Sequence, residues 1–174
     1  MSVKFDLMAD IEPFIALSKS TPVATALSLL RKPSVNFIVV VEDGNPQAVL
    51  DEGLLSNPLD QQRDTLADVL NGLPASIVRI AEGPIDENIL KAIESVLVRT
   101  KLPGLLLFGK DGAGIVARRT LSLMLTPYPA GETSFRMYIC RKCEPPSYSS
   151  PLEGDKAPDC PRSPVFHGPM ELDT

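Results

Sequence analysis

Tryptophan is absent from this chain of 174 residues, which contains only three tyrosines and six phenylalanines. This scarcity argues against the stacking platforms that bind single-stranded nucleic acid. Basic residues are not in excess either, since 17 lysines and arginines stand against 22 aspartates and glutamates, for a formal net charge of −5. A nucleic-acid-binding surface normally appears as a basic face, so the composition disfavours a nucleic-acid partner.

Long hydrophobic runs are missing as well. No apolar stretch approaches the roughly 20 residues of a membrane span, and residues 1–6 do not follow a signal-peptide pattern. The sequence therefore predicts no membrane segment and a cytoplasmic location, where thiols stay reduced. The apolar fraction of 44% still suffices for a core, and the length fits one ordinary domain with a small appendage.

An order of apolar segments and turn signals occurs twice within the first 125 residues. The prediction for each copy is β-α-β-β-α, from short apolar runs, helical spacing and Asp-Gly turns. The first copy comprises a strand at 14–17, a helix opened by Thr21 as N-cap and Pro22, a strand at 37–41, a turn at Asp43-Gly44, a strand at 48–50 and a helical turn at 51–55. The second comprises a strand at 77–80, a helix opened by Pro84, a strand at 105–108, a turn at Asp111-Gly112, a strand at 115–116 and a helix at 119–125.

The predicted fold class is therefore α+β, with helices and mixed sheets as in α/β proteins. Neither copy has enough apolar residues for a core of its own, so we expect the repeats at about 6–60 and 64–125 to pack as a pair.

This tandem order resembles a pair of cystathionine-β-synthase (CBS) domains over roughly residues 6–125. The likeness lies in the helix opening at 21–27, the strand and turn at 37–44, and the stretch Phe108 to Val116. The resemblance implies a regulatory module that binds adenosine nucleotides between its repeats and forms a homodimer.

In that family the ribose and phosphate contacts come from a Gly-x-x-Thr-x-x-Asp stretch. Both copies depart from this stretch, and neither has an acidic residue at the position of the Asp. An adenosine site needs such a residue to accept hydrogen bonds from the ribose hydroxyls. The corresponding residues are Gln47, Leu50 and Gly53 in the first copy, and Gly114, Ala117 and Thr120 in the second.

Other polar residues near these positions remain candidates for an adenine nucleotide or another anion. Arg118, Arg119 and Thr120 stand where the closing helix begins, and a helix start favours anions. Asp51 lies close to the missing acidic position of the first copy and is a candidate for a shifted substitute. The alternative interpretation is that all four are solvated residues at helix starts.

All three cysteines and the single histidine fall within the last 35 residues, spaced Cys-x2-Cys-x16-Cys-x6-His. Cys140, Cys143, Cys160 and His167 thus supply the thiolate and imidazole ligands of a tetrahedral zinc site. The gap of six residues before His167 exceeds the usual three to five. Because four ligands fill the shell, the zinc is predicted to be structural.

A redox pair and a disulfide framework both fit these cysteines less well. A thioredoxin-like redox pair should open a helix, whereas Cys143 is followed by Glu144-Pro145-Pro146. A disulfide framework would leave one of three cysteines unpaired.

The composition after residue 125 indicates a hinge at 126–133 and a zinc-ribbon-like tail at 134–174. An alternating strand at 135–139 runs into Cys140, and the segment 144–164, rich in Pro and Ser, is expected to bury no core. Metal would then decide whether the tail folds.

No serine or cysteine of the sequence has the acidic and basic companions of an activated nucleophile, which argues against an enzyme. The leading hypothesis is a regulatory or adaptor protein whose ribbon contacts a protein partner. The alternatives are an adenosine-nucleotide or anion sensor, and a nucleic-acid-binding zinc ribbon, which the acidic residues around the basic ones of the tail disfavour.

Overall fold

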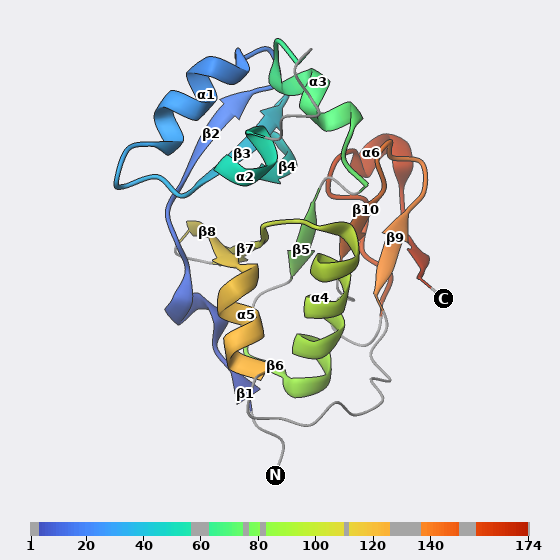
Figure 1. Ribbon diagram of the computed structural model, residues 1–174. Helices are drawn as coiled ribbons and strands as arrows, with labels where there is room; N and C mark the ends of the chain where they lie inside the picture. Colours follow the sequence, from blue (N-terminus) through green and yellow to red (C-terminus); the bar gives the residue numbers. More distant parts are fainter. Residues whose placement is uncertain are drawn as a thin grey trace.

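The structure is a computed structural model that describes residues 4–56, 63–74, 77–80, 83–109, 112–125, 137–149 and 156–173. It has the α+β fold that the sequence predicts, with small sheets flanked by helices (Figure 1). The predicted hinge at 126–133 lies outside the described residues. Within the described ranges, no helix combines the length and apolar character needed to cross a membrane.

The first half of the chain forms a three-stranded sheet in the order β2-β3-β4. β2 and β3 are parallel, and β3 and β4 form an antiparallel hairpin. Its core includes Ile38, Leu50 and Leu66, which are fully buried. The elements are β2 (Phe14–Ser18), α1 (Val23–Leu30), β3 (Phe37–Glu42), β4 (Asn45–Leu50), α2 (Glu52–Leu55) and α3 (Leu66–Asn71).

The second half follows a similar order and occupies the lower part of the view in Figure 1. β5 is parallel to β7, and β7 pairs antiparallel with β8. The amino-terminal segment joins this half, since β1 pairs with β6. The elements are β1 (Lys4–Phe5), η1 (Leu7–Asp10), β5 (Val78–Ile80), β6 (Ile85–Asp86), α4 (Glu87–Thr100), β7 (Gly104–Gly109), β8 (Gly112–Ala117) and α5 (Arg118–Leu125).

Both halves contribute side chains to one apolar layer between their sheets. Phe37, Val39 and Val49 of the first half pack in a single cluster with Leu106 and Ile115 of the second. All five are at most 5% exposed. Since full burial of one such side chain contributes about 1.5–3 kcal/mol, this layer is a strong reason for the halves to pack together.

Two predicted helix starts are wrong. Pro84 does not open α4, because Ile85 and Asp86 pair with β1 and the Asp86 carboxylate caps the helix by accepting from the Ile89 backbone N–H at 3.0 Å. The N-cap of α1 is Pro22 rather than Thr21, and no side-chain cap bond forms there.

Helix α3 was not predicted, although the sequence carries its signal. Thr65 precedes the helix and Asp68 is its third residue, which is the spacing of a capping box. The Thr65 backbone N–H and hydroxyl both donate to Asp68 Oδ2, at 2.9 Å each. Both bonds lower the pKa of Asp68, and the bond from the backbone N–H has the larger effect.

The tail adds strands to the sheet of the second half. β10 lies parallel to β5, with Tyr148 opposite Val78, and the sheet order is β11-β9-β10-β5-β7-β8. The expectation that 144–164 buries no core is therefore wrong, because Tyr148 joins the core of the second half together with Met137 and Ile139. The elements are β9 (Tyr138–Cys140), β10 (Ser147–Ser149), α6 (Pro164–His167) and β11 (Glu171–Leu172).

Candidate metal centre and cleft

The four predicted metal ligands lie at the end of β9 and just after it, and in and just before helix α6. Cys140 ends strand β9, and Cys143 follows in the turn that leads to β10. Cys160 precedes α6, and His167 is its last residue. The three thiols are at most 4% exposed, so the centre is closed to solvent on most sides.

The ligand atoms of these residues converge on one point. Cys143 Sγ lies 3.6 Å from Cys140 Sγ and 3.3 Å from Cys160 Sγ. His167 Nδ1 lies 3.5, 3.3 and 3.4 Å from the sulfurs of Cys140, Cys143 and Cys160. A tetrahedral zinc shell requires about 3.8 Å between sulfurs and about 3.5 Å between sulfur and nitrogen. These five distances are therefore within about 0.5 Å of the corresponding edges of a zinc site.

The same geometry decides against a disulfide. The bond between two sulfurs in a disulfide is about 2.05 Å long, and all three cysteines are free thiols separated by longer distances. A redox pair needs only two sulfurs, whereas a tetrahedral metal ion binds all four of the ligand atoms that meet here.

The pKa values of two of the thiols are shifted in opposite directions. The hydrogen bond with Cys143 lowers the pKa of Cys160 to about 4, while the same contact, followed by burial, raises the pKa of Cys143. Because a metal ion binds thiolates, it has to displace the proton of Cys143. Metal affinity at this centre is therefore expected to fall as the pH falls.

Arg162 connects the metal centre to the first half of the chain. It follows Cys160 by two residues, and its Nε donates to Gln47 Oε1 on β4 at 2.7 Å. Its Nη1 donates to the carbonyl oxygens of Glu144 and Pro145 at 3.2 and 3.0 Å. The sequence offered no signal for this contact, since it joins residues 115 positions apart.

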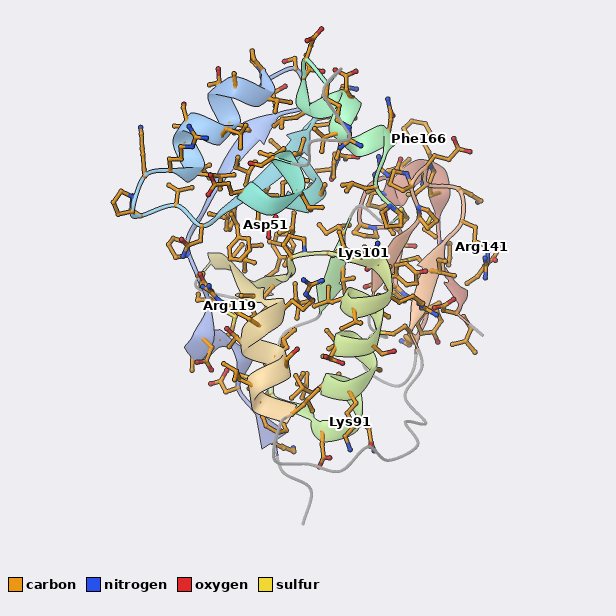
Figure 2. All side chains as sticks on the ribbon, in the orientation of Figure 1. Asp51, Lys91, Lys101, Arg119, Arg141 and Phe166 are labelled. Atoms are coloured by element: carbon orange, nitrogen blue, oxygen red, sulfur yellow. The ribbon has the colours of Figure 1, made fainter. Side chains whose placement is uncertain are left out.

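Three of the other four predicted site residues lie at a cleft between the two halves, with a volume of about 370 Å³. Asp51, Arg118 and Arg119 line it, whereas Thr120 does not. Figure 2 shows Asp51 and Arg119 on facing sides of the boundary between the halves. The structure thus brings three of the four together.

Two of these three side chains already have partners. Asp51 accepts from the Leu54 backbone N–H at 2.9 Å and caps α2. Arg119 Nη2 lies 3.2 Å from Glu12 Oε1, and Glu12 also accepts from Asn36 at 2.6 Å. Among the described residues Arg118 forms no ion pair, so it is the cation best placed to receive an anion.

No protein-family model matches the sequence, and no curated protein matches it either. The structure is similar to solved CBS domain pairs. The CBS domain pair of protein MJ0100, in complex with 5′-methylthioadenosine and S-adenosyl-L-methionine, is 14% identical with a TM-score of 0.52, over 72% of this chain and 98% of that one.

A second structure of that domain pair is 15% identical with a TM-score of 0.50, over 68% of this chain and 98% of that one. A CBS domain-containing protein from Kribbella flavida DSM 17836 is 16% identical with a TM-score of 0.45, over 70% and 97%. The two matches with TM-scores of 0.52 and 0.50 show that the α+β fold of this protein is that of a CBS domain pair, as its sequence pattern predicts.

Proposed function

We propose that this protein is a non-enzymatic regulatory adaptor of the cytoplasm, in which a CBS-like pair carries a structural zinc ribbon that contacts a protein partner. The observation that supports it most is the convergence of three thiols and one imidazole in a tail that shares its sheet with the second half. A metal at this centre would fix the tail against the body of the molecule.

Zinc is the metal that this donor set suits best. Soft thiolates with an imidazole in a tetrahedral arrangement select zinc among the common divalent ions. Cys140, Cys143, Cys160 and His167 would fill its shell and leave no position for a substrate or water. The proposed role of the metal is therefore structural.

The adaptor function predicts that partner binding depends on the metal centre. Immobilised wild-type protein should retain its partner from an extract, and Cys140→Ser should lose at least nine-tenths of that binding because the ribbon surface is no longer held. His167→Cys, which restores a four-ligand shell, should keep it. If mass spectrometry finds the same proteins on all three, the ribbon is not the contact surface.

A homodimer through the CBS-like pair also belongs to the proposal. Nucleic acid does not, because three of the basic side chains in the described part of the tail already bind groups of the protein itself. Lys142 Nζ donates to the His167 carbonyl at 2.8 Å, Arg141 lies 3.7 Å from Glu171, and Arg162 is held by Gln47.

A nucleotide or anion sensor is the second candidate, favoured by the cleft that contains Arg118. The similar MJ0100 pair is a complex with adenosine derivatives. If AMP binds here, a concentration of 100 times Kd stabilises the fold by about 2.7 kcal/mol, which is roughly 5–10 °C in Tm for a chain of this size.

Thermal denaturation with and without AMP measures this effect. Arg118→Ala should abolish the rise in Tm, while Lys32→Ala, at an exposed position in the first half that does not line the cleft, should preserve it. A wild-type Tm that AMP leaves unchanged would eliminate the sensor.

A further inference from the structure

Helix α6 presents two large apolar side chains to solvent. Val165 is 88% exposed and Phe166 is 86% exposed, more than any other large hydrophobic side chain in the described part of the chain. Single exposed apolar residues are common on protein surfaces, but these two are adjacent in sequence. Figure 2 shows Phe166 at the outer edge of the tail.

Contacts of His167 and its neighbours hold this apolar pair in place. His167 follows Phe166 directly, and its ring nitrogen lies within 3.5 Å of all three sulfurs. The His167 N–H donates to Ser163 at 2.9 Å, the Gly168 N–H to Pro164 at 3.1 Å, and Lys142 donates to the His167 carbonyl. A four-residue helix would otherwise fray. An aromatic side chain on a fixed backbone binds at a low cost in conformational entropy.

A groove of about 370 Å³ lies beside Phe166, between the tail and the β3–β4 hairpin. Phe166 and His167 form part of one wall, and Gln47 and Asn45 belong to the other. The groove therefore combines an apolar anchor with polar walls, which is the usual make-up of a peptide-binding site.

The charge of the groove is negative. Three acidic residues line it, Glu42, Asp43 and Glu144, against the basic residues Lys142 and Arg162. Both cations donate to groups of the protein itself. Glu42 pairs with Lys19, whereas no ion pair of Asp43 or Glu144 is found among the described residues. Three thiolates around one Zn²⁺ would leave the centre with a formal charge of −1, which adds to this potential.

We propose that this groove and the Val165–Phe166 pair form a docking site for a peptide segment of a partner protein. The segment carries an apolar side chain, which packs against Phe166, next to a lysine or arginine, which pairs with Asp43 or Glu144. This proposal rests on the adaptor function and states which side chains the protein partner of the adaptor presents. A second copy of the chain fits less well, because a two-fold contact would place the acidic groove against itself.

Panning of zinc-loaded, full-length protein against a phage-displayed library of random peptides tests the proposal. The enriched peptides should share an apolar residue adjacent to a lysine or arginine. For a synthetic peptide of that consensus, Phe166→Ala should weaken binding at least tenfold. Asp43→Asn and Glu144→Gln should each weaken it several-fold, most strongly at low ionic strength.

Leu123→Ala provides the control, because Leu123 is 72% exposed on α5, outside the tail. It should leave peptide affinity unchanged. Zinc content and Tm of every variant should equal those of the wild type, which keeps an effect on folding separate from an effect on binding.

The docking site is ruled out if panning enriches no peptide, or if the enriched peptides share an acidic consensus. It is also ruled out if Phe166→Ala binds the consensus peptide with the affinity of the wild type. Sedimentation that finds a wild-type dimer dissociated by Phe166→Ala would instead assign the surface to a second copy. If partner capture depends on Cys140 but not on Phe166, the adaptor function stands and only this site is wrong. If capture does not depend on Cys140, the adaptor function itself fails.

Discussion

Cys140→Ser is expected to release the zinc and with it the order of the tail. Wild-type protein should contain one zinc per chain, and the variant less than a tenth of that, by mass spectrometry of the metal. Binding at structural zinc sites contributes about 10–16 kcal/mol in finger peptides. Burial of Met137, Ile139 and Tyr148 in the core of the second half, at about 1.5–3 kcal/mol each, falls short of that amount. Hydrogen exchange should therefore become fast in β9 and β10, whose bonds order the tail.

His167→Cys is the matched control for this experiment. It exchanges one good zinc ligand for another, so the metal and the protection from hydrogen exchange should both survive. Since all three cysteines of the chain converge on the same point, no thiol is available elsewhere to compensate for the loss of Cys140. A Cys140→Ser variant as protected as the wild type and free of zinc would show that the tail does not depend on the metal.

Tyr148→Ala is expected to destabilise the whole second half by about 3–5 kcal/mol, as large aromatic truncations in cores do. Tyr148 is 8% exposed and packs in the same core as Val78 and Ile139. The Arg99 guanidinium lies 5.8 Å from the centre of its ring and adds a cation–π contact. Denaturant unfolding at saturating zinc measures the change, as a lower midpoint with an unchanged slope.

Tyr148→Phe separates packing from the hydroxyl group in this experiment. It keeps the ring, so its effect should stay below about 1 kcal/mol, in the range of one hydrogen bond. A Tyr148→Ala variant in which only the tail unfolds earlier, in a separate transition, would contradict the shared core. The tail would then be an independent folding unit.

The parts of the molecule that the sequence predicts are those with local signals. The runs at 37–41 and 105–108 are continuous and apolar, and they form the buried strands β3 and β7. The spacing of Cys140, Cys143 and Cys160 likewise identifies residues that the fold gathers within 4.8 Å of one another and of His167. Metal ligands are easy to recognise because few residue types can serve.

Contacts between distant segments carried no such signal. The pairing of β10 with β5 joins Tyr148 to Val78, and nothing in a stretch rich in Pro and Ser indicates that Tyr148 is buried. The same is true of β1 and β6, two-residue strands too short for any periodicity. The bond between Arg162 and Gln47 depends on how the tail packs against the first half, since β4 places Gln47 and the segment after Cys160 places Arg162.

The position of β10 has a consequence for how this protein is handled. β5 lies between β10 and β7, so its backbone donors and acceptors are covered on both sides. A fragment that stopped after α5 would expose one side of β5 to water. An uncovered strand edge is a template for pairing with other molecules, so the CBS-like body alone should be prone to self-association. The cysteine-rich tail thus protects this strand edge from pairing with other molecules.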